Sequence, residues 1–164
     1  MKNLFTILLL VLFCVLFSGC PVGIDHPIGT PGKEKVDPAL IGTWSTGQSE
    51  VEVSRLSISA RDEYSYQVEV LERGTTYALE TDNLTGWVTE LDGKKFFYLK
   101  PDNEEKYYHY MIKIYETGTM VTCDVSLLDG GVDAVVSTQS FRDQVSRSMN
   151  MEEYCAETIE WIKE

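Results

Sequence analysis

The feature that most restricts the fold of this 164-residue chain is an alternation of apolar and polar side chains with a period of two. Successive residues of a strand point to opposite faces, so this alternation predicts half-buried β-strands. Three segments carry it, with these apolar positions: Tyr64, Tyr66, Val68 and Val70; Tyr108, Tyr110, Ile112 and Ile114; and Val121, Cys123, Val125 and Leu127. The sequence therefore predicts antiparallel β-structure.

Turn signals recur along the same region and delimit about eight strands. They lie at Arg61-Asp62, Glu72-Arg73-Gly74, Asp82-Asn83, Asp92-Gly93, Pro101 to Glu105, Thr117-Gly118 and Asp129-Gly130-Gly131. Asp-Gly is the strongest of these signals for a tight hairpin. We expect residues 39–137 to form a mainly β domain, an eight-strand meander that either closes into a barrel or stays an open sheet or sandwich.

Beyond Gly131 the pattern changes to one typical of helices. Ser140 is followed three residues later by Asp143, and Asn150 by Glu153, as at helix N-termini. We therefore predict two short helices within residues 138–164, packed on the β domain. In the second helix, four residues share one face: Met151, Cys155, Ile159 and Ile162.

The predicted β domain opens with Leu40-Ile41-Gly42-Thr43-Trp44. This Gly-x-Trp is similar to the motif at the first strand of lipocalins and related calycin barrels, in which the tryptophan closes the barrel floor. The resemblance implies a lipocalin-like barrel that carries a small ligand. Two further family features are not recognised: a later Thr-Asp-Tyr motif, and a basic residue on the predicted last strand that would stack on Trp44. Core packing alone also explains this tryptophan.

Aromatic side chains are the candidates for lining a ligand pocket in such a barrel. The set is Trp44, Tyr64, Tyr66, Tyr108 and Tyr110. The four tyrosines are expected to point inward, and each buried hydroxyl needs a partner that a polar ligand or a trapped water supplies. The alternative is ordinary core packing, with the hydroxyls reaching the barrel mouth.

The N-terminus is typical of a signal peptide. Met1-Lys2-Asn3 provides a positive start, and the run from Leu4 to Phe17 has Thr6 as its only polar side chain. A membrane-spanning helix needs about 20 apolar residues. Pro21 follows this run too closely to allow that length. Export is therefore the better interpretation.

Phe17-Ser18-Gly19-Cys20 resembles the lipobox of bacterial lipoproteins, which has Leu, a small residue, Gly or Ala, and then Cys. The resemblance implies cleavage between Gly19 and Cys20, removal of residues 1–19 and attachment of lipid, with acyl chains such as palmitate, to Cys20. Each buried methylene contributes about 0.8 kcal/mol, so such chains hold a protein at a membrane. The resemblance further implies the bacterial cell envelope as the location, at the outer membrane facing the periplasm in a Gram-negative cell, because the residue after the cysteine is not Asp but Pro21.

Residues 20–38 are predicted to be the lipidated cysteine and a flexible tether. They hold four of the five prolines, which disfavour helix and sheet alike. Eighteen extended residues would reach at most about 60 Å. The alternative is a loop packed on the domain.

Four cysteines reduce to one candidate pair. Cys14 leaves with the signal peptide and Cys20 carries the lipid, which leaves Cys123 and Cys155 in an oxidising compartment. Both lie on predicted apolar faces. They form either a disulfide between sheet and helix or two buried free thiols.

No arrangement of residues indicates catalysis. His26 and His109 are expected at the surface, and no metal-ligand spacing occurs, so we predict no metal, no cofactor and no enzymatic activity. The 26 acidic residues exceed the 14 basic ones, which disfavours nucleic acid as a partner. Two hypotheses remain. One is a membrane-anchored module that binds a small apolar or amphipathic molecule; the other is a structural or interaction lipoprotein with a filled core, whose acidic surface meets a basic envelope protein.

Overall fold

The computed structural model of the chain describes residues 22–46, 54–74 and 82–164. Within these ranges lie eight strands, one α-helix and two short 3-10 helices. The strands are β1 (Gly42–Ser45), β2 (Arg55–Ala60), β3 (Tyr66–Glu72), β4 (Asn83–Leu91), β5 (Lys94–Pro101), β6 (Tyr108–Tyr115), β7 (Thr119–Asp124) and β8 (Ile159–Lys163). The helices are η1 (Pro38–Leu40), η2 (Val132–Ala134) and α2 (Thr138–Ser148).

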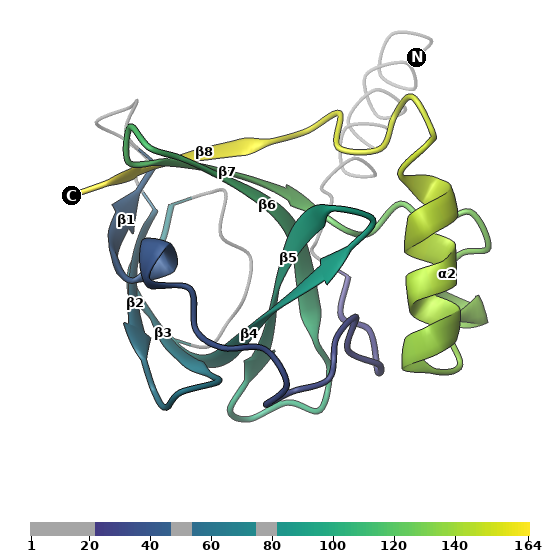
Figure 1. Ribbon diagram of the computed structural model, residues 1–164, viewed down its shortest axis with the longest axis horizontal. Helices are drawn as coiled ribbons and strands as arrows, with labels where there is room; N and C mark the ends of the chain where they lie inside the picture. The colour runs from purple at the N-terminus through teal and green to yellow at the C-terminus, as the bar shows by residue number, and fades with distance from the viewer. Residues whose placement is uncertain (1–21, 47–53, 75–81) are drawn as a thin grey trace, which may run out of the picture.

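The described strands form a closed antiparallel barrel in which each strand pairs with its neighbours in the chain (Figure 1). Closure comes from β8, which pairs with β1 so that Trp44 lies opposite Lys163. The barrel, rather than an open sheet, is therefore the architecture of the β domain. It is consistent with the fold that the lipocalin resemblance implies.

The inner core fills the barrel with alternate residues of the strands. Its buried members are Leu40, Trp44, Leu56, Ile58, Tyr66, Val68, Val70, Leu84, Val88, Phe97, Leu99, Ile112, Met120 and Trp161. Gly86 contributes no side chain because a Cβ there would lie 2.8 Å from the Phe97 ring. The interior of this barrel is thus largely occupied by its own side chains.

A second core lies on the outside of the barrel, between the sheet, α2 and the N-terminal segment. Its buried members are Ile24, Ile28, Phe96, Tyr98, Val125, Leu128, Phe141 and Val145. Figure 1 shows α2 beside the barrel. Several strands are therefore apolar on both faces, inside the barrel and beneath α2.

The expectation that residues 20–38 form a flexible tether is wrong for the part of them that the structure describes, residues 22–38. Ile24 is 2% exposed and Ile28 is fully buried, and both belong to the outer core. Ile24 also forms an antiparallel bridge with Tyr107. Proline and glycine exclude regular structure here, but two isoleucines among them are enough to pack the segment against the sheet. The alternative of a packed loop is the one observed.

Both faces of β7 carry buried residues. Met120 belongs to the inner core, and Thr122 Oγ1 accepts a hydrogen bond from Trp161 Nε1 inside the barrel. Cys123 instead pairs across the sheet with Met111, which packs on the outer core. Alternation identified the strand correctly. It does not say which face lies inside the barrel, because the outer face of this strand is also covered by apolar residues.

The second predicted C-terminal helix is wrong, because the described residues contain only one α-helix after β7. Residues 159–163 are β8 instead, with Trp161 inside the barrel, so the barrel extends into the region expected to be helical. Cys155 has a φ of 61°, which no α-helix accommodates. The apolar spacing of four, four and three residues was compatible with a helix, but β1 and β7 offer backbone partners on both sides of an extended segment.

Candidate functional site

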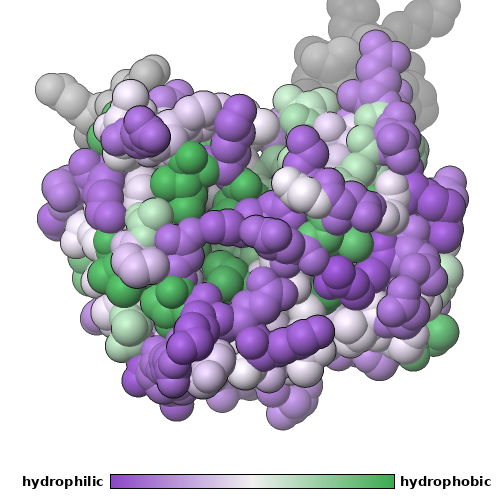
Figure 2. All heavy atoms as spheres, viewed as in Figure 1, coloured by the Kyte–Doolittle hydropathy of each residue, from purple (hydrophilic) through white to green (hydrophobic). Residues whose placement is uncertain are grey.

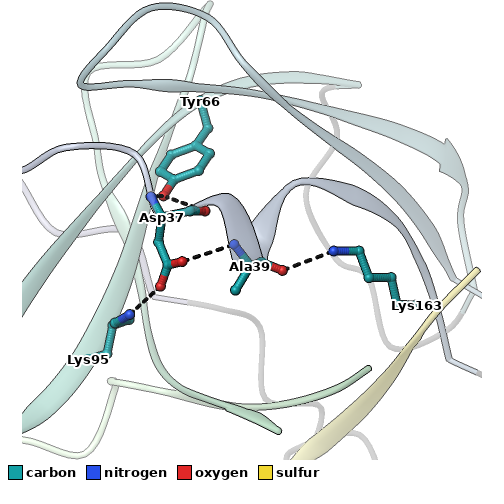
Figure 3. Close-up of polar contacts among 5 residues, drawn as sticks. All are labelled: Asp37, Ala39, Tyr66, Lys95 and Lys163. Atoms are coloured by element: carbon teal, nitrogen blue, oxygen red, sulfur yellow. Dashed lines mark hydrogen bonds and ion pairs between the residues drawn. The ribbon is translucent and has the colours of Figure 1, made fainter. Parts of the chain in front are cut away.

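The η1 end of the barrel is closed by a network of polar contacts (Figure 3). Asp37 is the N-cap of η1, and its carboxylate accepts from Ala39 N at 2.9 Å and pairs with the Lys95 ammonium. The Tyr66 hydroxyl accepts from Asp37 N. Partial burial raises the pKa of Asp37, but Lys95 and the Ala39 N–H outweigh it and hold that pKa below its usual value. These contacts hold η1 in place across this end of the barrel.

Trp44 lies at the centre of this closed end and is fully buried. Its Nε1 donates to Leu40 O at 2.8 Å. Lys163 covers the ring, with Nζ 5.3 Å from the ring centroid, and donates to Ala39 O at 3.1 Å. Lys163 is therefore the basic residue over Trp44 that was not recognised in the sequence. It was missed in the sequence because it lies on β8, which the sequence predicts as helix.

The structure places four of the five predicted pocket residues in or against the inner core and leaves Tyr64 outside it. Trp44 and Tyr66 are fully buried at the η1 end. Tyr108 and Tyr110 pack half-buried against the inner core on β6. Tyr64 lies in the β2–β3 turn, where it lines a separate outer groove with Arg61 and Trp87. Only Tyr108 and Tyr110 remain neighbours on the inner face of one strand.

A groove of about 690 Å³ opens where β5 and β6 separate, and we call it the β5–β6 groove. The last pair between these strands is Lys95 with Ile112, and β6 continues beyond it to Tyr115. The apolar lining comprises Met111, Ile112, Ile114, Tyr115, Val121 and the disulfide of Cys123 with Cys155. Figure 2 shows hydrophobic surface in a hollow framed by hydrophilic side chains.

Charges of both signs line the β5–β6 groove. Its basic residues are Lys94, Lys95 and Lys113, and its acidic residues are Asp37, Glu90 and Glu116. Lys95 is paired with Asp37, and the Lys113 ammonium lies 4.7 Å from the centroid of the Tyr115 ring. An apolar floor with a charged margin is chemically suited to an amphipathic molecule.

At the opposite end of the barrel, which we call the Tyr108 end, the pKa values of Tyr108 and Asp124 are raised. The Tyr108 hydroxyl donates to Glu104 at 2.9 Å, and burial together with Glu104 raises the pKa of Tyr108 to about 12. Asp124 pairs with Tyr110 across the sheet, so both side chains share the inner face. Burial raises the pKa of Asp124 to about 6, although Ser126 and the Val125 N–H oppose the shift.

Cys123 and Cys155 form a disulfide with their Cα atoms 5.4 Å apart. It links the outer face of β7 to the segment that follows α2. Both cysteines line the β5–β6 groove, so the bond fixes one wall of it.

His109 is not at the surface as expected, since it is only 1% exposed. Its Nε2 accepts from Ile28 N at 3.2 Å, and its ring meets Phe141 edge-on with centroids 4.6 Å apart. Burial lowers the pKa of His109 to about 3. The residue is on the polar parity of β6, but that parity faces the outer core. Its role here is to hold the N-terminal segment.

The described residues contain no group of three or more His, Cys, Asp or Glu side chains that could hold a metal ion. No helix in this part of the chain is long and apolar enough to cross a membrane. Gly19, Cys20 and the expected signal peptide lie outside the described residues. No family model, curated protein or solved structure matches this chain.

Proposed function

We propose that this protein is an exported, lipid-anchored module that binds a small amphipathic molecule in the β5–β6 groove. The lipobox-like residues ending at Cys20 support the anchor. The observation that carries the binding proposal is the groove itself, which has an apolar floor and opens beside the barrel interior. Because side chains fill the core at the η1 end, the ligand would bind in this groove and not in the barrel interior.

The groove follows from the unequal lengths of neighbouring strand pairings. β5 and β6 stop pairing at Lys95 and Ile112, while β6 and β7 stay paired as far as Tyr115 and Thr119. Ile114 thus lies on a strand edge with no partner from β5. A space between separated strands exposes apolar side chains that a continuous sheet would bury.

The mixed charges at the groove margin favour a ligand with a polar head. A purely hydrocarbon molecule would offer no polar group to the ammonium groups of Lys94 and Lys113, and a multiply charged anion would meet Glu90 and Glu116. An apolar chain with one polar group fits both the floor and the margin. The polar group of the ligand would then contact the lysines while its apolar chain covers the groove floor.

Native mass spectrometry with solvent extraction of the purified protein tests for a co-purified molecule. Binding of the apolar dye N-phenyl-1-naphthylamine, followed by fluorescence, then compares Tyr115→Asp with Leu127→Asp. These two side chains have nearly equal exposure, 41% and 38%, and only Tyr115 lines the groove. We expect Tyr115→Asp to weaken dye binding at least tenfold and Leu127→Asp to leave it unchanged. A bare mass over several preparations, with equal dye binding in both variants, would overturn the proposal.

A second candidate is a structural or interaction lipoprotein. The observation that favours it is the complete burial of Leu40, Trp44 and Tyr66, which leaves the η1 end of the barrel filled. The chain's formal charge of -12 would then attract a basic protein of the envelope. Binding of such a partner should weaken steeply as salt concentration rises.

A further inference from the structure

The N-terminal segment is fastened to the barrel from Ile24 onward. Ile24 N donates to Tyr107 O at 2.9 Å, and Tyr107 N donates to Ile24 O at 2.8 Å. Farther along, Ile28 N donates to His109, and Ile28 O accepts from Arg142 of α2 at 2.9 Å. Backbone pairing, burial and two side chains thus hold the segment in place.

The attachment leaves little chain between Cys20 and the barrel. Ile24 is four residues after Cys20 in the sequence. Four extended residues span at most about 14 Å. Whatever holds Cys20 therefore holds the surface around Ile24 within that distance.

That surface is the β5–β6 turn at the Tyr108 end. Tyr107 directly precedes β6, and a Cβ on Gly23 would lie 3.0 Å from Lys106 and 3.3 Å from Tyr108. The β6–β7 turn at Thr117 is at the other end of β6, whose eight residues span about 24 Å at 3.4 Å each. The two turns are thus at clearly different distances from Ile24, where the attachment begins.

We propose that the barrel rests on a phospholipid surface with its β5–β6 turn toward the headgroups and its β6–β7 turn away from them. The inference rests on the proposed lipid on Cys20 and goes beyond it, because an anchor alone does not orient a domain. Orientation follows from the short connection to Ile24. It places the Tyr108 end of the barrel, with Tyr110 and Asp124 on the inner face, beside the membrane.

Charge does not provide a competing explanation for this orientation. The β5–β6 turn carries Lys106, but also Asp102, Glu104 and Glu105. Lys100, near the end of β5, is already paired with Glu105. Such a mixed surface has little net attraction for anionic lipid. The orientation should therefore persist at high salt.

The test uses the full lipidated protein in phosphatidylcholine vesicles that contain an energy-transfer acceptor on a headgroup. Glu105→Cys and Thr117→Cys each add one reactive thiol, since Cys123 and Cys155 are bonded and Cys20 would carry lipid. A donor dye is attached to that thiol. We expect clearly stronger transfer from position 105 than from position 117, at low and high salt alike.

A matched variant tests the cause. A flexible Gly-Ser segment of about fifteen residues inserted between Val22 and Gly23 should make transfer from the two positions equal. Equal transfer without the insertion, or a difference lost in high salt, would overturn the proposed orientation while leaving the anchor intact. Mass spectrometry that finds no lipid on Cys20 would overturn the anchor, and the orientation with it.

Discussion

The Lys163 ammonium lies over the Trp44 ring, 5.3 Å from its centroid, and donates to Ala39 O on η1. One side chain of the last strand thus contacts both the first strand and the helix that closes the barrel. The contact couples barrel closure by β8 to the placement of η1.

Replacing Lys163 should measure this coupling. Lys163→Met keeps most of the apolar stem but loses the cation and the hydrogen bond, and we expect a loss of about 1–2 kcal/mol in the free energy of unfolding. Lys163→Arg keeps the positive charge and should retain much of this stability. Denaturant unfolding followed by tryptophan fluorescence gives both values, with the exposed Lys94→Met as control. Equal stabilities for the Lys163 and Lys94 variants would contradict the coupling.

His109 predicts a loss of stability in mild acid. Its pKa is about 3 in the folded protein and about 6.5 when unfolded, so the unfolded state binds a proton first as the pH falls. Stability is complete above pH 6.5 and declines below it, by up to about 1.4 kcal/mol per pH unit. In His109→Gln the slope between pH 6 and 4 should become shallower. An unchanged slope would show that another group is responsible.

Asp124 predicts the opposite trend. Its pKa is about 6 in the folded protein and 3.8 in the unfolded chain, so the cost of a charged carboxylate is present above pH 6 and disappears as the folded group takes up a proton. Asp124→Asn should therefore stabilise the protein by about 1–3 kcal/mol at pH 8 and by almost nothing near pH 4. Thermal unfolding at the two values tests it. Stabilisation of the same size at both would refute the titration argument.

The disulfide should contribute to stability through the chain that it closes. Cys123 and Cys155 are 32 residues apart, and a loop of that length corresponds to about 3–4 kcal/mol in the chain-entropy model. We expect a lower melting temperature in dithiothreitol than without it. The double variant Cys123→Ala with Cys155→Ala should melt low in both conditions. A wild-type protein that is insensitive to reductant, with thiols shown to be free, would contradict the prediction.

Local patterns in the sequence predicted the strands, and several turns follow them closely. Asp92 and Gly93 have φ of 51° and 71°, as a tight hairpin requires, between the paired residues Leu91 and Lys94. The faces of the strands were harder to assign. Alternation tells the two faces of a strand apart but does not say which is inside, and His109 shows that the polar parity can be buried.

Features that depend on distant partners could not be predicted. β8 is extended because β1 and β7 accept it, and its own apolar spacing is equally compatible with a helix. The N-terminal segment is held in place because Ile24 and Ile28 pack in the outer core together with Phe141 and Tyr98. Neither partner is near in the sequence. The β5–β6 groove likewise results from where two pairings stop, which no local pattern encodes.

Barrel closure by β8 also limits when the protein can fold. Until residues 159–163 are available, β1 and β7 each present an open edge, and the Trp44 ring lacks its cover from Lys163. A chain that emerges N-terminus first therefore cannot complete its barrel until residues 159–163 have emerged. Until then the unpaired edges of β1 and β7 are open to pairing with a strand of another chain, so the last strand decides how long the incomplete barrel is exposed to aggregation.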